Sequence, residues 1–309
     1  MHAPGGGVEG GDTLRLGAIL KYGEPTIEAV AELERAGMPK ADIARLTGIK
    51  TQDLDKVLAA RIPPNAFDPN PLPDALELGG DFIIVGDVHV PCTDYDFAQL
   101  VGRVADKTGI HRLIIAGDFF DMDGWSKFQH AVPPATWVQE RTAARILIGD
   151  WLEVFSEIYT LQGNHDRRLV KWTASQLDEG DVWGMVNTSD KLHHSKHSYC
   201  TVNSAGVYWR VTHPANYGRN QLTVLSDIAN KYQTNVIGYH EHHSARGWDV
   251  YKRYVIVNGG MLVDARKLAY VQLEDNRMPN MAPGFVVLRG GVATVLGKYP
   301  FTDWGRVLG

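Results

Sequence analysis

From residue 80 onward the chain alternates short apolar runs with stretches of helical periodicity, and this alternation constrains its fold more than any other feature. Six runs have the length and composition of buried strands: 82–85, 113–116, 158–161, 207–211, 235–237 and 255–257. Helical patterns separate several of them, over 98–107, 135–155 and 222–232. Strands that alternate with helices indicate an α/β fold with at least part of its sheet parallel. The part from Tyr199 onward is richer in strands, which predicts a second sheet.

Polar side chains follow five of these runs, each at the point where the predicted strand ends. They are Asp87 and His89, then Asp118 and Asp121, then Asn164, His165 and Asp166, then His213, and finally His240, His242 and His243. In open α/β sheets, sites form beyond the carboxyl ends of the strands, so residues this far apart in sequence can converge. A glycine follows four of the five runs, which lets the chain turn sharply out of the sheet.

The residue types at these strand ends predict a metal centre. Carboxylate, carboxamide and imidazole without thiolate suit Mn²⁺, Fe, Zn²⁺ or Ni²⁺ rather than Ca²⁺ or an iron–sulfur cluster. The candidate ligands are Asp87, His89, Asp118, Asn164, His213, His240 and His242. This set is too large for one tetrahedral ion but suits two ions that share a carboxylate. Two such ions can bind a phosphoryl oxygen and supply a bridging hydroxide at neutral pH.

The ordered set of blocks resembles the calcineurin-like metallophosphoesterases of phage and bacterial type. The blocks are Asp87-x-His89, Gly117-Asp118-x-x-Asp121, Gly163-Asn164-His165-Asp166, His213 and His240-x-His242, and the resemblance covers about residues 80–300. Any single block is weak, and a lone buried Asp or His is usually structural. The resemblance implies a four-layer α/β/β/α sandwich of two mixed sheets.

The resemblance also implies a role for each residue. Asp87, His89, Asp118 and His242 would hold one divalent ion, and Asp118 would bridge to a second ion that Asn164, His213 and His240 complete. Mn²⁺ is the expected metal, with Fe, Zn²⁺, Ni²⁺ or Co²⁺ as alternatives. His165 would not bind metal; it would stabilise the transition state and protonate the leaving oxygen. Asp166 would orient His165.

Two positions depart from the family pattern. Tyr239 stands where the last block usually has glycine, and Gly238 lies one position earlier. His240 and His242 are the preferred pair of ligands, but the adjacent His243 could replace His242 if the register slips. Thr212 fills the place of the glycine that often precedes the histidine of the fourth block. Neither departure removes a ligand type.

Three residues near the blocks are candidate substrate contacts. Arg167 and Arg168 could clamp a substrate phosphate, the alternative being a salt bridge to a surface carboxylate. Trp125 could stack on a base, although most tryptophans here fall on apolar faces and are expected in the core. Asp121 is either part of the metal site or the cap of a loop.

Two further features are expected to be structural. The cluster of His193, His194 and His197 follows none of the predicted strands, so a solvated loop is expected there. Cys92 has no basic neighbour in sequence, which favours a packed thiol over a nucleophile.

The first 79 residues differ in texture from the rest. Residues 1–12 are glycine-rich and predicted to be disordered, and residues 13–61 have helical patterns. Within them, a helix over 38–46, a turn at 47–50 and a helix with Thr51 as its N-cap resemble a helix-turn-helix. Prolines between Ile62 and Pro73 predict an extended linker over 62–79, followed by the catalytic domain over 80–309.

The charge of this helical module leaves its role open. Residues 25–61 hold six basic and six acidic side chains, and the candidate recognition helix carries Asp53 and Asp55. Because phosphate contacts dominate DNA affinity, these carboxylates oppose DNA binding. The module could therefore bind DNA, dock a protein partner or form a homo-oligomer.

Composition excludes several other classes of protein. The net charge of −5 excludes a general coat of positive charge, and two cysteines exclude a disulfide scaffold. The longest apolar stretches are too short to span a membrane, and the start of the chain lacks the pattern of a secretory signal. The expected location is the cytoplasm.

The sequence thus predicts a dinuclear metal-dependent phosphoesterase that hydrolyses phosphodiester bonds, with DNA, RNA or a nucleotide as substrate. A cyclic-nucleotide phosphodiesterase or a general phosphatase is the alternative within the same class, because the metal blocks do not specify the substrate. The alternative from another class is a DNA- or protein-binding adaptor with a vestigial phosphoesterase domain.

Overall fold

A computed structural model describes residues 30, 33, 38–54, 74–126, 133–268, 281–298 and 302–309. The chain divides into two compact units, Met1–Ala66 and Phe67–Gly309. The predicted disordered start, most of the first predicted helix and the linker up to residue 73 lie outside the described residues. None of the helices in these described ranges combines the length and apolar character that a membrane crossing requires.

Within its described residues 38–54, the first unit has two helical segments on either side of Gly48. Helix α3 (Lys40–Thr47) begins after Pro39 and ends at Gly48, whose φ of 71° lets its N–H reach the carbonyl of Ala44. A second helix occupies residues 51–54, so it begins at Thr51 rather than after it. Their small apolar core holds Val30, Ile43, Ile49 and Leu54. The helices lie where the sequence predicts them, and the module's role stays a prediction.

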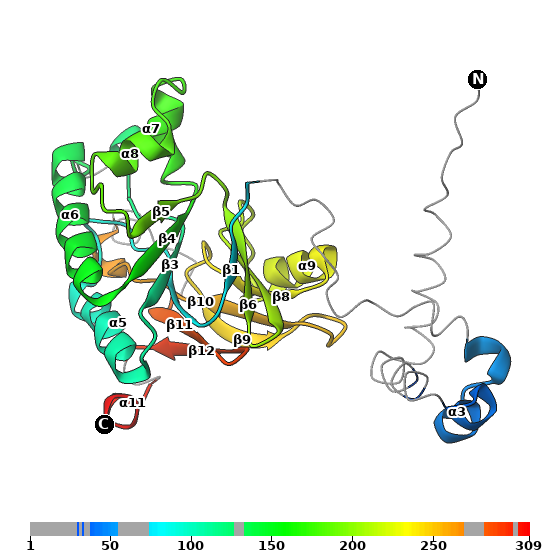
Figure 1. Ribbon diagram of the computed structural model, residues 1–309. Coiled ribbons are helices and arrows are strands. Elements are labelled where there is room, and N and C mark those ends of the chain that lie inside the picture. Colours follow the sequence, from blue (N-terminus) through cyan, green and yellow to red (C-terminus); the bar gives the residue numbers. More distant parts are fainter. Residues whose placement is uncertain are drawn as a thin grey trace, which may run out of the picture. The chain divides into compact units, whose positions relative to one another are not determined.

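The second unit is built on two six-stranded sheets (Figure 1). One sheet has the order β12 (Val292–Gly297), β11 (Gly284–Arg289), β2 (Phe82–Val85), β3 (Arg112–Ala116), β4 (Glu157–Leu161) and β5 (Leu192–His194). The other has the order β1 (Glu77–Gly79), β6 (Tyr199–Ser204), β7 (Val207–Thr212), β8 (Asn235–Gly238), β10 (Val255–Gly259) and β9 (Ser244–Trp248). All six strands predicted from apolar runs are present.

Both sheets are mixed, as expected. Strands β2, β3, β4 and β5 are parallel to one another, and so are β7, β8 and β10. The remaining neighbours of these strands include antiparallel pairs, such as β11 with β2 and β6 with β7. In each parallel group the carboxyl ends lie along one edge of the sheet, which brings together the loops that follow the strands.

Helices α5 (Tyr95–Thr108), α6 (Trp137–Val154) and α9 (Thr223–Tyr232) cover the outer faces of the sheets. The other helices of this unit are α7 (Arg167–Trp172), α8 (Glu179–Gly184), which contacts β5, and α11 (Trp304–Leu308), which packs against α5. Figure 1 shows α5 and α6 side by side on the β3–β4 sheet and α9 next to β8. The Asp94 side chain caps α5, and α6 starts with a capping box of Thr136 and Gln139.

Alternation along β2 shows how the layers are built. Ile83 and Val85 belong to the apolar core between this sheet and helices α5 and α6, whereas Phe82 and Ile84 belong to the core between the two sheets. A third core joins α9 to the outer face of the other sheet through residues such as Leu225 and Ile256. Three cores between four layers give the predicted α/β/β/α sandwich.

Two segments differ from the sequence expectations. Residues Glu77–Gly79, which were assigned to the linker, form β1 because their backbone pairs in parallel with Thr201–Asn203 of β6. The histidine cluster is not a solvated loop: His193 and His194 belong to β5 and stack on Tyr159 and Trp183, with ring centroids 4.9 and 5.3 Å apart. Backbone pairing with β4 orders this segment, although its polar sequence does not resemble that of a buried strand.

Tyr239, the departure from the family pattern, fills the space between the two sheets. Its side chain is fully buried, and its hydroxyl donates a hydrogen bond of 2.7 Å to the carbonyl of Ile84. Two glycines leave room for the ring: a Cβ at Gly86 would lie 2.5 Å from Tyr239, and a Cβ at Gly259 would lie 2.2 Å from it. The larger residue is thus accommodated by small residues on neighbouring strands.

We predict that Gly259→Ala lowers the free energy of unfolding by about 1–3 kcal/mol, because the added methyl overpacks the Tyr239 ring. Tyr239→Phe should cost about 1 kcal/mol through the lost hydrogen bond. Gly149→Ala is the control, because a Cβ there meets no atom within 4 Å, and it should be neutral or stabilising within α6. Urea unfolding followed by tryptophan fluorescence measures all three; equal stability of Gly259→Ala and wild type would contradict this packing.

Candidate metal centre

The structure gathers six of the seven predicted ligands into two groups at the strand ends. One group holds Asp87, His89 and His242, and the other holds Asp118, His213 and His240. Within each group one potential ligand atom from each residue lies within 4.8 Å of the others. Asn164, the seventh, adjoins the second group, because its Oδ1 lies 3.2 Å from Nε2 of His213. Loops from both sheets therefore meet at one place.

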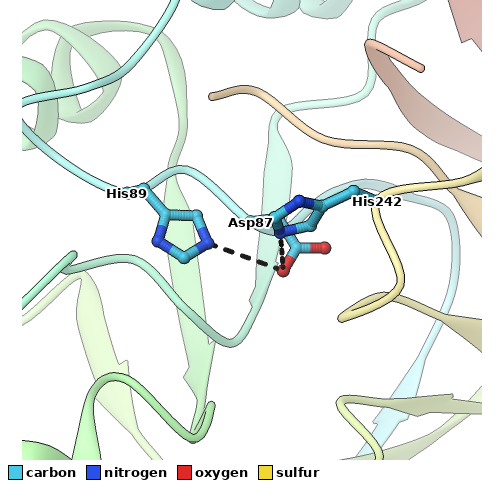
Figure 2. Close-up of side chains that lie close together, drawn as sticks. All are labelled: Asp87, His89 and His242. Atoms are coloured by element: carbon cyan, nitrogen blue, oxygen red, sulfur yellow. Dashed lines mark ion pairs between the residues drawn. The ribbon is translucent and has the colours of Figure 1, made fainter. Parts of the chain in front are cut away.

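Figure 2 shows the first group, in which both imidazoles face the carboxylate of Asp87. Nε2 of His242 lies 3.4 Å from Asp87 Oδ1, and Nε2 of His89 lies 3.9 Å from the same oxygen. Asp87 Oδ1 and His89 Nε2 are buried without a hydrogen-bond partner among the described residues. Buried polar atoms normally have partners, so this carboxylate and imidazole fit a cation between them.

Asp118 lies between the two groups. Its Oδ2 is 3.2 Å from Nε2 of His213 and 3.9 Å from Nε2 of His89. Its Oδ1 accepts a hydrogen bond of 2.8 Å from the backbone N–H of His165. One carboxylate oxygen thus faces imidazoles of both groups, which is the position that a bridging ligand needs.

Hydrogen bonds to the other ring nitrogen orient two of the histidines. Nδ1 of His89 lies 3.1 Å from Oδ1 of Asp121, and Nδ1 of His213 lies 2.9 Å from the carbonyl of Ala116. Because both partners are acceptors, each Nδ1 carries a proton. The Nε2 atoms point into the two groups and would bind a metal in place of any proton that they carry.

The backbone at the site is strained. Five of the predicted ligands have positive φ: Asp87 (48°), His89 (48°), Asp118 (50°), His240 (91°) and His242 (56°). Such conformations are uncommon for residues with a side chain and persist only where surrounding contacts enforce them. Here the carbonyl of Asp118 accepts from the N–H groups of Val88 and His89. Strain concentrated on these positions supports a functional site.

Glycine permits the closest approach between two of the blocks. A Cβ at Gly163 would lie 2.0 Å from Oδ1 of Asp118 and 2.2 Å from its backbone nitrogen. A side chain at this position would therefore push apart the loops after β3 and β4. The glycine of the Gly163-Asn164-His165-Asp166 block thus has a steric reason rather than a conformational one, because its φ is not positive.

The electrostatics of the site are those of buried carboxylates that need positive charge. Burial opposes ionisation, but the neighbouring histidines, His242 at Asp87 and His213 at Asp118, lower the pKa of both carboxyl groups. Burial likewise opposes the charged form of His213, yet Asp118 raises the pKa of this imidazole to about 9. Protons on the histidines and metal ions can both balance this negative charge.

His165 and Asp166 differ from their expected pairing. Asp166 does not take its place beside the His165 ring: its carboxylate accepts hydrogen bonds from the backbone N–H groups of Asp118, Phe120 and Gly163. The ring of His165 is held by the carbonyl of Asp121, 2.6 Å from Nδ1. Asp166 therefore fixes the loops after β3 and β4 to each other, a role that depends on the approach of two distant segments.

The predicted substrate arginines have different surroundings. Arg168 donates to the carbonyl of Asp121 (3.1 Å), to Oδ1 of Asp123 (3.2 Å) and to Nε2 of His165 (3.0 Å). Its side chain remains 18% exposed at the site. Arg167 instead donates to the side chain of Gln162. Arg168 thus forms the salt bridge that was the alternative to a phosphate contact, here with Asp123. The same guanidinium also lies beside His165.

Trp125 and Cys92 belong to the packed structure. The ring of Trp125 contacts that of Trp137, with centroids 6.0 Å apart, and it packs against the core below α5 and α6. Burial raises the pKa of the Cys92 thiol to about 12, which leaves it without nucleophilic character at neutral pH. This packing does not support a role for Trp125 in stacking on a base.

The geometry favours His242 over His243 in the last block. His242 faces Asp87, whereas the ring of His243 lies near Tyr217, with centroids 6.4 Å apart, and its backbone carbonyl accepts from Gly260. Because successive side chains point in different directions, only one of two adjacent histidines can face the first group.

Sequence reasoning undervalued two carboxyl groups. Asp121 was left undecided, but it orients His89 through its side chain and His165 through its carbonyl. The sequence signal for this role was the position of Asp121 at the end of the second block, Gly117-Asp118-x-x-Asp121.

Glu140 of α6 is fully buried, accepts a 2.9 Å hydrogen bond from the N–H of Met122, and leaves Oε1 unpartnered among the described residues. It lies within a helical pattern, so its sequence gave no sign.

Comparison with known proteins identifies the fold family. The family model for calcineurin-like phosphoesterases matches residues 80–265, which is more than half of the chain. The chain belongs to the calcineurin-like phosphoesterase family. No curated protein matches the chain in a sequence comparison. This family assignment confirms the resemblance on which the site residues were predicted.

Solved structures of similar fold include YfcE, a phosphoesterase from E. coli, with 13% identity, a TM-score of 0.39 and coverage of 70% of this chain and 92% of that one. Vps29 of Chaetomium thermophilum has 12% identity, a TM-score of 0.41 and coverage of 72% and 95%. A Zn²⁺ complex of Vps29 from Entamoeba histolytica has 13% identity, a TM-score of 0.35 and coverage of 70% and 97%.

We predict that His242→Ala weakens binding of one of two Mn²⁺ ions by at least about tenfold, because the variant lacks an imidazole that faces Asp87. His243→Asn is the matched control and should bind both ions as the wild type does. Equilibrium dialysis with elemental analysis measures the stoichiometry. Loss of an ion in His243→Asn with retention in His242→Ala would show that the register is the opposite one.

The buried carboxyl group of Glu140 is expected to make the stability of the fold depend on pH. Burial raises the pKa of its carboxyl group to about 8 in the folded protein, above the ordinary value of 4.5. Between these values the folded state binds more protons than the unfolded state, so stability falls as the pH rises. We predict that Glu140→Gln flattens this fall and is roughly 2 kcal/mol more stable at pH 8 than the wild type. Urea unfolding at pH 5.5 and 8 measures it; parallel pH profiles would contradict the prediction.

Proposed function

We propose that this protein is a dinuclear metal-dependent phosphodiesterase that acts on nucleic-acid or nucleotide esters. The observation that supports the proposal most directly is the meeting of two donor groups at Asp118, with buried ligand atoms of Asp87 and His89 left unpartnered among the described residues. Family membership supplies the phosphoester chemistry, and the donor geometry supplies a place for two cations.

The ligand assignment follows the two groups. Asp87, His89, Asp118 and His242 would hold one ion, and Asp118, Asn164, His213 and His240 would hold the other. Mn²⁺ is the proposed metal, because oxygen and imidazole donors without thiolate suit it; Fe, Zn²⁺, Ni²⁺ and Co²⁺ share that preference. When bound, such a pair supplies a Lewis acid for the phosphoryl oxygens and a hydroxide nucleophile at neutral pH.

His165 is the proposed general acid, and its hydrogen bonds indicate the atom that acts. The Asp121 carbonyl keeps a proton on Nδ1, so Nε2 is the atom that would take a proton from water and then hand it to the leaving oxygen. Arg168 donates to that same Nε2 in the absence of substrate. A substrate phosphate would compete for the guanidinium, which forms stronger bonds to an anion than to an imidazole, and would free Nε2.

Asp121 couples metal binding to this acid. Its carboxylate orients His89, a proposed ligand, while its carbonyl accepts from both His165 and Arg168. Movement of Asp121 would therefore displace the proposed ligand, the proposed acid and the arginine proposed to bind phosphate at the same time. Asp166 supports the same arrangement by holding the backbone of Asp118 next to that of Gly163.

The proposal of a nucleic-acid or nucleotide ester rests on the chemistry around the centre. A phosphodiester carries a single negative charge, which one guanidinium at Arg168 can match. The helical segments at 40–47 and 51–54, with Gly48 between them, follow one another in the order that a helix-turn-helix has, which is compatible with a nucleic-acid substrate. General phosphatase activity is the competing function, and it is separated by comparing phosphodiester and phosphomonoester substrates.

We predict that the wild type with Mn²⁺ hydrolyses bis-p-nitrophenyl phosphate faster than p-nitrophenyl phosphate, and that His89→Ala loses this activity. His165→Ala should retain both ions but lose about 10²–10⁴-fold in kcat, because proton transfer to the leaving group is removed. His111→Ala is the control, since His111 lies just before β3, whereas Asp118 follows the strand's other end. Full activity of His89→Ala would reject the metal-dependent mechanism, and metal loss in His165→Ala would make His165 a ligand.

We predict that deletion of residues 1–61 leaves hydrolysis of bis-p-nitrophenyl phosphate unchanged but slows hydrolysis of a polymeric substrate, because the helical module would contribute contacts only to a long chain. Single-stranded DNA, double-stranded DNA and RNA of equal length form the substrate panel. An unchanged rate on every polymer would exclude a substrate-binding role for the module and leave docking of a protein partner or a second copy.

A further inference from the structure

A loop beside the second donor group has a firmly held backbone and an exposed aromatic side chain. Residues 214–222 connect β7 and His213 to α9, so the loop starts at a proposed ligand. Tyr217 in this loop is 41% exposed.

Buried polar side chains hold the loop. Glu241, which is only 2% exposed, accepts a 2.7 Å hydrogen bond from the N–H of Gly218 through Oε1. Its Oε2 accepts a 2.8 Å bond from the side-chain amide of Asn258, and the same amide donates to the carbonyl of Gln221 at 3.0 Å. Glu241 lies in sequence between His240 and His242, so the loop is tied directly to the ligand-bearing segment.

Glycine at position 218 is part of this arrangement. A Cβ there would lie 2.8 Å from Oε1 of Glu241 and 3.0 Å from the side chain of Val224. The hydrogen bond to Glu241 therefore fixes the backbone directly after Tyr217. An aromatic side chain on a rigid segment loses little freedom when it binds a ligand, which favours affinity.

The Tyr217 ring lies next to the second donor group. Its centroid is 6.5 Å from that of His240, with the two planes at 81°, and 6.4 Å from that of His243. Arg219, two residues further along the same loop, is exposed. The rim of the site thus presents a flat aromatic ring and a cation, whereas Trp125 is committed to packing against Trp137.

We propose that Tyr217 is a specificity-determining residue that stacks on the base of a nucleoside phosphodiester whose phosphate lies at the metal centre. The inference rests on the proposed function and deepens it by naming the substrate class. In a nucleoside ester the base is separated from the phosphorus by one sugar, so a ring beside His240 is placed to meet it. Stacking is tolerant of sequence, because every base has a π-face.

The test compares two esters that share a leaving group: thymidine 5′-(p-nitrophenyl phosphate) and methyl p-nitrophenyl phosphate. For Tyr217→Ala we expect KM for the thymidine ester to rise about tenfold with kcat within twofold, and both constants for the methyl ester to stay unchanged. Tyr217→Phe should behave as the wild type, since the ring is retained. Tyr208→Ala is the matched control, because Tyr208 is 40% exposed near the start of β7, at the end opposite His213.

A binding measurement separates failure of this inference from failure of the proposed function. Isothermal titration of the full-length Mn²⁺-loaded protein with thymidine 5′-monophosphate should give an affinity about tenfold lower for Tyr217→Ala than for the wild type. Equal loss on both esters, or unchanged nucleotide affinity, would overturn the role of Tyr217. If the wild type hydrolyses neither ester but Tyr217→Ala still weakens nucleotide binding, the base-binding role stands and the hydrolytic function fails.

Discussion

The buried carboxylate of Asp118 is the group on which the rest of the site depends. Its Oδ2 faces imidazoles of both donor groups, and its Oδ1 accepts the N–H of His165. Its backbone accepts from the loop after β2 and donates to Asp166. A carboxylate taken out of water is stable as an anion only beside positive charge. Asp118 therefore draws the ligands together and also makes their arrangement depend on protons or metal ions.

The fold holds several proposed ligands in backbone conformations that are unfavourable for residues with a side chain. Left-handed backbone at several proposed ligands costs of the order of 1–3 kcal/mol each, and contacts between neighbouring strand ends offset it. The absence of a side chain at Gly163 lets the loop after β4 reach Asp118, and Asp166 then fastens the two loops through three backbone amides. The apolar cores between the layers thus supply the stability that offsets the local backbone strain.

The residues of the family blocks lie beside residues outside those blocks. Tyr239 replaces a small residue between the sheets, and the glycines that face it show how the neighbouring strands adapt. Arg168 joins the proposed acid to the loop of Asp121, and Tyr217 stands at the rim on a backbone clamped by Glu241. Since the same metal chemistry serves many esters, the proposed selection of a substrate falls to residues outside the ligand set, such as Arg168 and Tyr217.

The sequence by itself indicated six of the described strands, the main helices and the candidate donor residues, because apolar runs and the polar residues that end them are local features. Tertiary structure decided how those donors divide, that His242 rather than His243 faces Asp87, that Asp166 braces backbone amides, and that Asp121 orients His165. It also turned His193 and His194 into an edge strand and brought Glu241 under the Tyr217 loop. Each of these depends on contacts between segments far apart in the chain, whose mutual approach is set by sheet pairing and by packing between layers rather than by any local pattern.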